Sequence, residues 1–289
     1  MKREWAWAYL FIAPQMVGLL AFALFPTLAV LVLSFSSWDL IHAIQGVGLV
    51  NYSGELSDPV FWHAVTNTIY FTVVSIPATL IVALLVALVL NRKMALRSWY
   101  RAAFFMPVIT PVVAVALVWA WLLEPSYGLI NVLLSDIGIT GPPWLASLQW
   151  AMPSVMLVSV WRGFGYSMVI FLAGLQGVPP HLYEAAKVDG AGRWQQFWHV
   201  TVPMLSPTTF FLLVTSVISS LQVFDQIYVL TGGQAGPADA TRVIVFHIYE
   251  LAFRLFQFGQ ASAVTVLLFI AILIVTLLQF RFTQWVHYE

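Results

Sequence analysis

Six long apolar stretches constrain this chain more than any other feature of its sequence. Each holds about 20 residues or a few more, the length that an α-helix needs to cross the roughly 30 Å hydrocarbon layer of a membrane. The stretches cover residues 9–33, 68–90, 104–123, 151–176, 208–230 and 261–280. Because lipid offers the backbone no hydrogen-bond partners, each stretch must form its own helix. The sequence therefore predicts an all-α membrane protein with six transmembrane helices.

The composition agrees with lipid as the main solvent of this chain. Only 8% of the 289 residues are charged, against about 25% in a soluble domain. Lys and Arg together number 12, and so do Asp and Glu. This balance argues against nucleic acid as a partner, because phosphate binding needs a clustered basic excess. The chain contains no cysteine, so disulfides and thiolate metal sites are excluded.

The first apolar stretch follows Lys2 and Arg3, an arrangement that secretory signal peptides share. Its length of about 25 residues exceeds the 7–15 residues of a signal-peptide core, and no small-residue cleavage site follows it. We therefore expect this stretch to be retained as a membrane helix.

The distribution of Lys and Arg predicts how the chain is oriented in the membrane. Two of these residues, Arg242 and Arg254, fall in outer segments, and Arg162 lies within a span. The inner segments hold the other nine, which are Lys2, Arg3, Arg92, Lys93, Arg97, Arg101, Lys187, Arg193 and Arg281. Such a bias is typical of cytoplasmic loops. It predicts a multi-pass protein of the inner, cytoplasmic membrane of the cell, with both termini in the cytoplasm.

One outer segment, residues 242–258, is mixed in polarity. Its polar residues His247, Glu250, Arg254 and Gln257 recur at steps of three or four among apolar residues. This spacing predicts an amphipathic helix at the outer interface or against the helix bundle. The segment is too polar for a seventh span. We find no internal repeat or low-complexity linker, so residues 1–289 are interpreted as a single transmembrane domain.

The motifs that would supply catalysis or an energy source are missing from the sequence. There is no phosphate-binding loop of the form GxxxxGK[ST], no helical HxxxH spacing and no GxSxG elbow. We therefore expect no catalytic residue, metal site or cofactor in this chain. The ionisable residues deep in the spans are Arg162 and, nearer an end, Asp225, fewer than an ion-driven pump normally carries. The chain is expected to be a transport pathway or scaffold that depends on partners for energy.

The cytoplasmic loop at about residues 179–206 is unusually polar and rich in helix signals. Pro179 and Pro180 favour a helix start, so residues 182–188 are predicted to be helical. Gly190 and Gly192 allow a tight reversal, and a second helix is predicted over residues 194–200, ending near Pro203. The result would be a rigid helix–turn–helix facing the cytoplasm. The alternative is a loop that lies on the lipid headgroups through Trp194, Phe197 and Trp198.

The same loop resembles the EAA loop of permease subunits in ATP-binding-cassette (ABC) importers. That pattern is Glu-Ala-Ala, three residues, Gly, nine residues and Ile-x-Leu-Pro. Here it is matched by Glu184-Ala185-Ala186, Gly190 and Val200-Thr201-Val202-Pro203, with valines replacing isoleucine and leucine. The stretches "FFMPVITPVVAVALVWAWLLEPSYGLIN" and "SLQVFDQIYVLTGG" are similar to the carbohydrate-uptake branch, the maltose and glycerol-3-phosphate type. Within that branch the chain resembles the first of two unlike permeases.

The resemblance implies a fold and a set of partners. The fold would be that of a type I ABC importer permease. The partners would be a second permease in a heterodimer, two ABC ATPases that bind ATP and Mg, and an extracytoplasmic solute-binding protein. The solute would be a sugar or a sugar-like molecule. In this family the EAA loop docks on the ATPase, so the resemblance assigns docking to Glu184, Ala185, Ala186, Asp189 and Gly190. Glu184 would pair with a basic group, and Gly190 would form a turn that a Cβ would block.

Two spans carry the candidate residues of the substrate path. Candidates in the fourth span are three or four positions apart and so share one face of the helix. The resemblance to the maltose type implies that substrate contacts lie on this span and on the fifth. The candidates are Ser159, Arg162, Gly163, Tyr166, Ser216, Ser219, Ser220 and Asp225. Tyr166 and Tyr228 would suit stacking on sugar rings.

The role of Arg162 stays open between two interpretations. It could face a polar solute, and a phosphate would suit it, as in a glycerol-3-phosphate or glycerophosphodiester importer. It could instead be a structural group that pairs with Asp225 or with backbone carbonyls. Two other functions remain as alternatives for the whole chain: an ion-driven secondary transporter, and a structural membrane subunit without a solute path.

Overall fold

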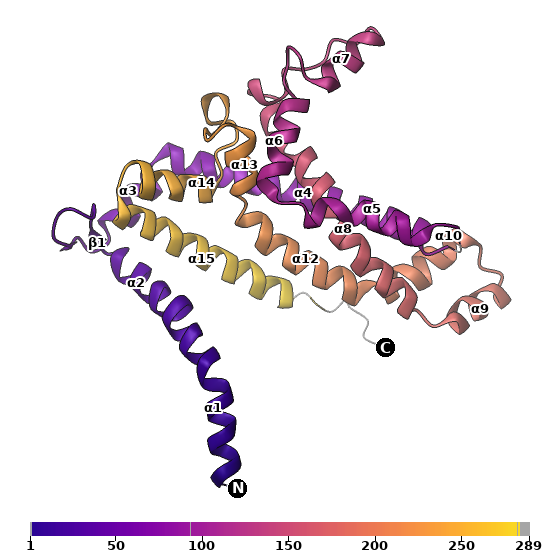
Figure 1. Ribbon diagram of the computed structural model, residues 1–289. Helices are drawn as coiled ribbons and strands as arrows, with labels where there is room; N and C mark the ends of the chain where they lie inside the picture. The colour runs from indigo at the N-terminus through magenta and orange to yellow at the C-terminus, as the bar shows by residue number, and fades with distance from the viewer. Residues whose placement is uncertain (1, 93, 282, 284–289) are drawn as a thin grey trace. The chain divides into compact units, whose positions relative to one another are not determined.

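The computed structural model describes residues 2–92, 94–281 and 283, with side chains from residue 10 onward (Figure 1). Lys93, one of the basic residues used above for orientation, and the C-terminal residues 284–289 of the single domain lie outside this description. Contacts divide the described chain into two compact units. Unit 1 contains the residues up to Trp62 and His247–Ala271, and unit 2 contains His63–Phe246 and the residues from Ile272 onward.

The regular secondary structure of the described chain is helical, apart from a hairpin of two short strands, β1 (Ser36–Ser37) and β2 (Gln45–Gly46). Four helical segments are long and apolar enough to cross a membrane, and the number rises to six when each of two bent helix pairs counts as one span. The four are residues 10–33 within α1 (Lys2–Leu19), η1 (Leu20–Leu24) and α2 (Phe25–Leu33), then α4 (Pro59–Leu90), α8 (Ala151–Gly177) and α15 (Phe258–Arg281). The prediction of an all-α multi-pass membrane protein is confirmed.

The third predicted span is not straight. Residues 104–123 fall in α5 (Arg97–Ile109) and α6 (Val112–Leu122), which meet at 96°. The bend lies at Thr110, whose backbone is extended (φ −74°, ψ 135°). Pro111 follows, and a proline disfavours the helical conformation of the residue before it. The sequence contained this signal, and the span predicted over these residues is present as a bent helix pair and not as one continuous helix.

The fifth predicted span, residues 208–230, is interrupted. It divides into α12 (Ser206–Leu221) and α13 (Asp225–Leu230), with residues 222–224 outside both helices. Before α12 the chain forms α10 (Arg193–Gln196), η3 (Phe197–Thr201) and α11 (Val202–Met204), which bend by 61° into α12. No proline or glycine lies at positions 222–224, so no local signal predicted this break.

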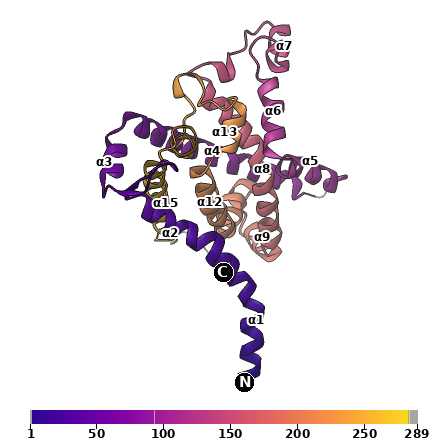
Figure 2. The same cartoon turned by 60° about the vertical axis from the view of Figure 1, so that its left-hand side comes forward.

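Unit 2 holds its helices together through two apolar clusters. Within it, α5 packs along α8, α12 packs on α8, and α13 lies between α6 and α8 (Figures 1 and 2). The first apolar cluster includes Phe71, Val115, Leu123, Val155, Val158, Ile227 and Phe246. The second includes Ala83, Leu90, Phe164, Met168, Phe171, Leu172 and Leu212.

One glycine sets the distance between α5 and α8. A Cβ at Gly165 would collide with the backbone oxygen of Phe104. The two helices therefore approach closely only because position 165 has no side chain, as is common where membrane helices pack through small residues. The close approach brings α5 to the side of α8 that carries the candidate site.

Unit 1 contains α3 (Val50–Ser57), η5 (Glu250–Arg254) and the last residues of α14 (Ile244–Tyr249). The helix predicted over residues 242–258 is present as α14 and η5, but His247 points inward. Its Nε2 lies 2.9 Å from the Glu55 carboxylate, and both side chains are only 5% exposed. The second polar pair, Arg254 with Glu250 at 3.5 Å, is more open. The polar stripe thus packs against protein through His247.

The buried pair predicts a stability effect. Glu55→Ala would leave His247 buried without its carboxylate, and breaking such a pair costs about 3 kcal/mol. We expect a lower thermal unfolding midpoint of the purified protein in detergent. Asp136→Ala, which removes an exposed carboxylate at the end of α7 (Leu129–Asp136), is the control and should leave the midpoint unchanged. Equal midpoints for the two variants would contradict this account of unit 1.

Candidate functional site

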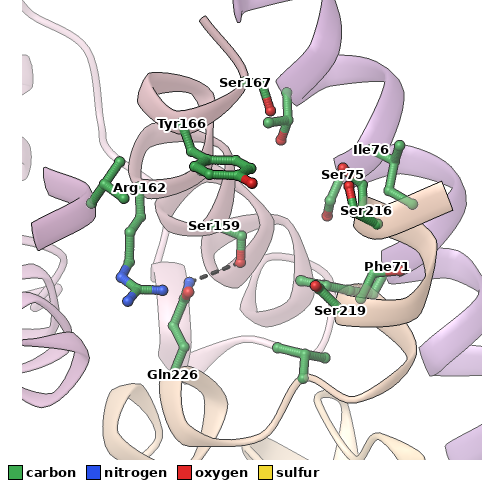
Figure 3. Close-up of a pocket in the computed structure, with 16 residues that line it drawn as sticks. Phe71, Ser75, Ile76, Ser159, Arg162, Tyr166, Ser167, Ser216, Ser219 and Gln226 are labelled. Atoms are coloured by element: carbon green, nitrogen blue, oxygen red, sulfur yellow. Dashed lines mark hydrogen bonds between the residues drawn. The ribbon is translucent and has the colours of Figure 1, made fainter. Parts of the chain in front are cut away.

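A cavity of about 450 Å³ lies inside unit 2 and is lined by α4, α5, α8, α12 and α13 (Figure 3). Its polar lining consists of hydroxyl groups, one amide and one guanidinium. The residues that supply them are Ser75, Thr79, Ser159, Arg162, Tyr166, Ser167, Thr215, Ser216, Ser219, Ser220 and Gln226. The volume lies within the range of about 300–1,000 Å³ that is usual for small-molecule sites.

The cavity lies at the middle depth of the bundle, between the two apolar clusters. Along α4, Ser75 lies between Phe71 of the first cluster and Ala83 of the second. Along α8, Ser159 directly follows Val158 of the first cluster. Since α4 has 32 residues and rises about 1.5 Å per residue, it is long enough to cross the whole hydrocarbon layer. A polar chamber in the middle of such a bundle is where membrane transporters bind their solutes.

The structure brings together seven of the eight residues predicted for the substrate path. These seven, which line the cavity, are Ser159, Arg162, Gly163, Tyr166, Ser216, Ser219 and Ser220. Gly163 contributes backbone only, with the Thr79 methyl group beside it. The serines of α12 lie across the cavity from Arg162 (Figure 3).

Asp225 and Tyr228 are placed differently from the prediction. Asp225 is exposed at the start of α13 and does not line the cavity. Among the described side chains, Arg162 forms no ion pair with Asp225. Tyr228 packs on Phe224 and Phe246, with ring centroids 5.3 Å and 6.2 Å apart, at the edge of the first apolar cluster. The break before α13 turns Asp225 away, which a continuous helix would not do.

Gln226 is a buried polar residue of the lining that the sequence analysis missed. Its side chain is 6% exposed, and its Nε2 donates to Ser159 Oγ at 2.8 Å and to the Val155 carbonyl at 3.1 Å (Figure 3). These bonds tie α13 to α8 across the cavity. Irregular backbone at membrane depth is tolerated where it lines a cavity, and Val223 of the break does so. The one available signal was an amide inside an apolar run.

The lining from α4 was also missed. Ser75 and Thr79 stand one helical turn apart in α4, a spacing that puts both on one face. Close to the cavity, Ser220 Oγ donates to Thr72 Oγ1 at 3.0 Å and so joins α12 to α4. The spacing of the hydroxyl residues along α4 was the sequence signal that could have indicated a third wall of the cavity, next to those of α8 and α12.

Arg162 is the one charged residue among those that line the cavity. Its Nε is buried and has no hydrogen-bond partner among the described residues. In Figure 3 its side chain extends toward that of Gln226. An uncompensated charge at this depth is costly, so it must face protein dipoles, water or a ligand. The site can therefore donate hydrogen bonds to solute hydroxyl groups and can attract an anionic oxygen.

A second candidate site is the EAA-like loop. The structure confirms the helix–turn–helix geometry that the sequence predicted there. Helix α9 (Pro180–Val188) is followed by a turn at Gly190, whose φ is +80°. A Cβ at Gly190 would meet nothing within 4 Å, so a side chain there would oppose the turn through its backbone conformation and not through lack of space. The left-handed backbone is what favours glycine here. The turn is fixed by Gln196 Nε2, which donates to the Ala191 carbonyl at 2.8 Å.

The residues assigned to docking are accessible. Glu184, Ala185, Asp189 and Gly190 are exposed and Ala186 is half-buried. Glu184 forms no ion pair within the described part of the chain.

A hollow of about 210 Å³ separates the two short helices of the loop, with Ala186, Asp189 and His199 among its walls. Trp194, which is 71% exposed, stacks on Phe197 with ring centroids 5.9 Å apart. The loop thus presents one surface with small residues and exposed carboxylates, and a second surface that is aromatic.

No group of three His, Asp or Glu side chains is placed to hold a metal ion in the part of the chain that the structure describes.

Comparisons with known proteins agree with this architecture. Residues 76–288 match the family model "Binding-protein-dependent transport system inner membrane component". The chain is 38% identical over 285 residues to the "Probable ABC transporter permease protein YesP" of Bacillus subtilis, covering 97% of this chain and 92% of that one. It is 36% identical over 277 residues to the lactose transport system permease protein LacF of Rhizobium radiobacter, with 94% and 92% covered.

A solved structure is similar over nearly the whole length. It is the crystal structure of a bacterial alginate ABC transporter in complex with an alginate pentasaccharide-bound periplasmic protein. One of its chains has 26% identity and a TM-score of 0.86, covering 98% of this chain and 95% of that one. The fold and the mid-depth cavity define a membrane permease. The chain belongs to the family of inner membrane components of binding-protein-dependent transport systems, the permeases of ABC importers.

The geometry of Gln226 generates a prediction for transport. Gln226→Leu removes the amide that holds Ser159 and leaves the Val155 carbonyl without this donor. We expect uptake by the reconstituted transporter to fall about tenfold, since a buried hydrogen bond contributes about 1 kcal/mol and an unpaired group costs more.

The matched control is Gln222→Leu, in the same break but exposed and outside the cavity lining. It should leave uptake within about twofold of the unchanged protein. A loss of the same size in both variants would remove Gln226 from the site.

Proposed function

We propose that this chain forms, together with a second permease, the translocation path of an ATP-driven importer for a sugar or sugar-like solute. The observation that carries the proposal is the mid-depth cavity, in which hydroxyl groups from α4, α8 and α12 surround one amide and one guanidinium. Hydroxylated solutes need donors and acceptors of this kind to replace their water. The names of the relatives, which include lactose and alginate transport, support a carbohydrate-like solute.

The energy comes from partners in this proposal. Two ABC ATPases, which hold the ATP and Mg, would dock on the exposed residues of α9 and its turn, and the chain itself would be non-catalytic. Glu184 would pair with a basic group of the ATPase. Trp194 and Phe197 would face the headgroups on the other side, so both interpretations of the loop would apply to different surfaces. An extracytoplasmic solute-binding protein would deliver the solute from outside.

The breaks in the helices suggest how the path opens. Helix α12 ends and α13 begins at the cavity, and α5 bends sharply into α6. Discontinuous helices at mid-depth are typical of transporters that alternate between inward-facing and outward-facing states. Closure of the ATPases would move α9. Since α9 follows α8 in the chain, the motion would shift the cavity wall of α8, which carries Arg162, relative to the wall of α12.

An anionic solute is a second candidate. The observation that favours it is Arg162, the one charged residue of the lining, with a buried Nε that has no partner among the described residues. A guanidinium binds carboxylate and phosphate groups in a planar, two-point geometry. A sugar acid or a sugar phosphate would offer such a group. An ion-driven secondary transporter, the alternative from another class, finds no support in the family of this chain.

The proposal is tested by co-purification and reconstitution. Affinity purification of this chain from its native membrane should recover an ATPase and a second permease. Proteoliposomes that contain the complex and the binding protein should take up solute when ATP is present on the cytoplasmic side. Uptake by the chain alone in ATP-free vesicles would overturn the proposal.

The docking role predicts a separation of binding from coupling. Glu184→Lys reverses the charge of an exposed side chain and should lower ATPase stimulation and uptake at least tenfold, because like charges at a contact repel. Capture of solute by the binding protein should persist. His181→Lys, an equally exposed position at the start of α9, is the control and should retain ATPase coupling. Full coupling in Glu184→Lys would exclude Glu184 from docking.

The role of Arg162 predicts a change in charge selectivity. Arg162→Gln keeps hydrogen-bond donors but removes the charge. If the solute is anionic, uptake should fall by about tenfold or more, the expected loss of a charge-assisted hydrogen bond. If it is neutral, uptake should change less than threefold. The measurement is uptake of a neutral sugar and its acidic counterpart by the same proteoliposomes. Loss of assembly in Arg162→Gln, read by co-purification, would show a structural role instead.

A further inference from the structure

Two arginines at the start of α5 meet a glutamine in the last turn of α8, away from the cavity. With the Gln176 amide turned so that its oxygen faces α5, this oxygen accepts hydrogen bonds from Arg97 Nη2 at 2.7 Å and Arg101 Nη2 at 2.9 Å. The arginines are four positions apart on α5, which places them on one face of the helix. Arg97, Arg101 and Gln176 are called the arginine cluster below.

The arginine cluster concentrates positive charge that the described chain does not neutralise. An amide oxygen carries no net charge, and like charges four residues apart on a helix repel each other. Arg97 is the first residue of α5, where the helix dipole is positive and disfavours cations. Neither arginine pairs with a carboxylate among the described residues. The Nε atoms of both are buried without a partner in the same part of the chain.

The surroundings of the cluster indicate a membrane interface. Trp99 and Tyr100, directly beside Arg101, are 75% and 45% exposed, and such aromatic residues gather at the boundary between hydrocarbon and water. The distribution of Lys and Arg assigns this end of α5 to the cytoplasmic side. The cytoplasmic leaflet is rich in anionic lipids, which basic residues near the surface attract.

We propose that the arginine cluster binds the phosphodiester headgroup of an anionic phospholipid. The planar guanidinium matches two phosphate oxygens at once. Each arginine has five N–H donors, of which the contact with Gln176 uses one. A glutamine holds the two guanidinium groups together without cancelling their charge, whereas a glutamate at position 176 would neutralise one of them. The phosphate supplies the missing negative charge.

The site adjoins the loop that faces the cytoplasm. Gln176 is the penultimate residue of α8, and α9 begins at Pro180. A lipid phosphate bound to Arg97 and Arg101 would hold both guanidinium groups in place, and these groups bond Gln176 at the end of α8, directly before the helix–turn–helix. This part of the fold should therefore become more stable when anionic lipid is present.

The experiment uses the full-length chain purified with its partner subunits and placed in phosphatidylcholine nanodiscs with increasing fractions of phosphatidylglycerol. Two quantities are measured: the lipid retained after detergent extraction, by native mass spectrometry, and the thermal unfolding midpoint. Loss of a hydrogen bond to a charged group corresponds to roughly tenfold in binding. Arg97→Gln/Arg101→Gln should therefore weaken the specific phosphatidylglycerol binding by at least about tenfold and abolish its effect on the midpoint.

The matched control is Arg92→Gln/Arg193→Gln. It removes two exposed charges from the same side of the membrane and outside the cluster, and it should keep the specific binding. If the first variant fails to fold, Arg97→Lys/Arg101→Lys is measured instead. It keeps the two charges but loses the planar guanidinium groups, so it should still bind phosphatidylglycerol more weakly than the unchanged protein.

Three results would overturn the proposal. Binding by the cluster variants could equal that of the unchanged protein. The loss could be the same in the control, which would indicate diffuse attraction rather than a site. Lipid retention could stay constant while the ATPase dissociates from the cluster variants, which would assign the cluster to a carboxylate of the partner protein instead.

Discussion

The rest of this structure depends on one constraint: polar groups at mid-depth of a membrane must satisfy each other, because hydrocarbon satisfies none of them. In unit 2, the polar side chains that line the cavity lie between the two apolar clusters. Gln226 bonds Ser159 and the Val155 carbonyl, and Ser220 bonds Thr72. These contacts join α4, α8, α12 and α13 around the cavity, so the groups that shape the site also hold its walls.

The same constraint explains why much of the fold could be predicted from the sequence and some could not. Long apolar runs must become helices in lipid, so α4, α8 and α15 followed directly from composition and length. The bend at Thr110 has a local cause in Pro111 and was readable in principle. The break at residues 222–224 has no such cause, because it depends on contacts that Gln226 makes with a segment about 70 positions away.

The site could be predicted to a similar extent. Ser159, Arg162 and Tyr166 share a face of one helix, so the period of the helix was enough to group them. Asp225 was grouped with the serines of α12 on the assumption that the helix continues, and the break turns it outward. The wall from α4 was missed because isolated hydroxyls in a span usually bond their own helix, and only packing shows which of them face a cavity.

The local geometry of the EAA-like loop complements that of the cavity. Its turn depends on the left-handed backbone of Gly190 and on bonds such as Gln196 to Ala191, so the loop is a rigid body that can transmit force. The cavity, in contrast, is bordered by α5, which bends sharply into α6, and by the break between α12 and α13. In the proposed function, this loop would dock on the ATPase and would be joined through α8 to cavity walls that contain helix breaks, where a hinge motion can occur.

The central claim is that the mid-depth cavity is a solute path that opens to the two sides in turn. The chain has no cysteine, so Ser219→Cys introduces the one thiol of this chain, and its labelling in the reconstituted complex can be read on this chain after the subunits are separated. We predict that a membrane-impermeant thiol reagent reaches this position from the cytoplasmic side without nucleotide and from the outer side with bound ATP. Solute should protect it in at least one state. A thiol that stays unlabelled from both sides in every state, while the complex still transports solute, would contradict the account.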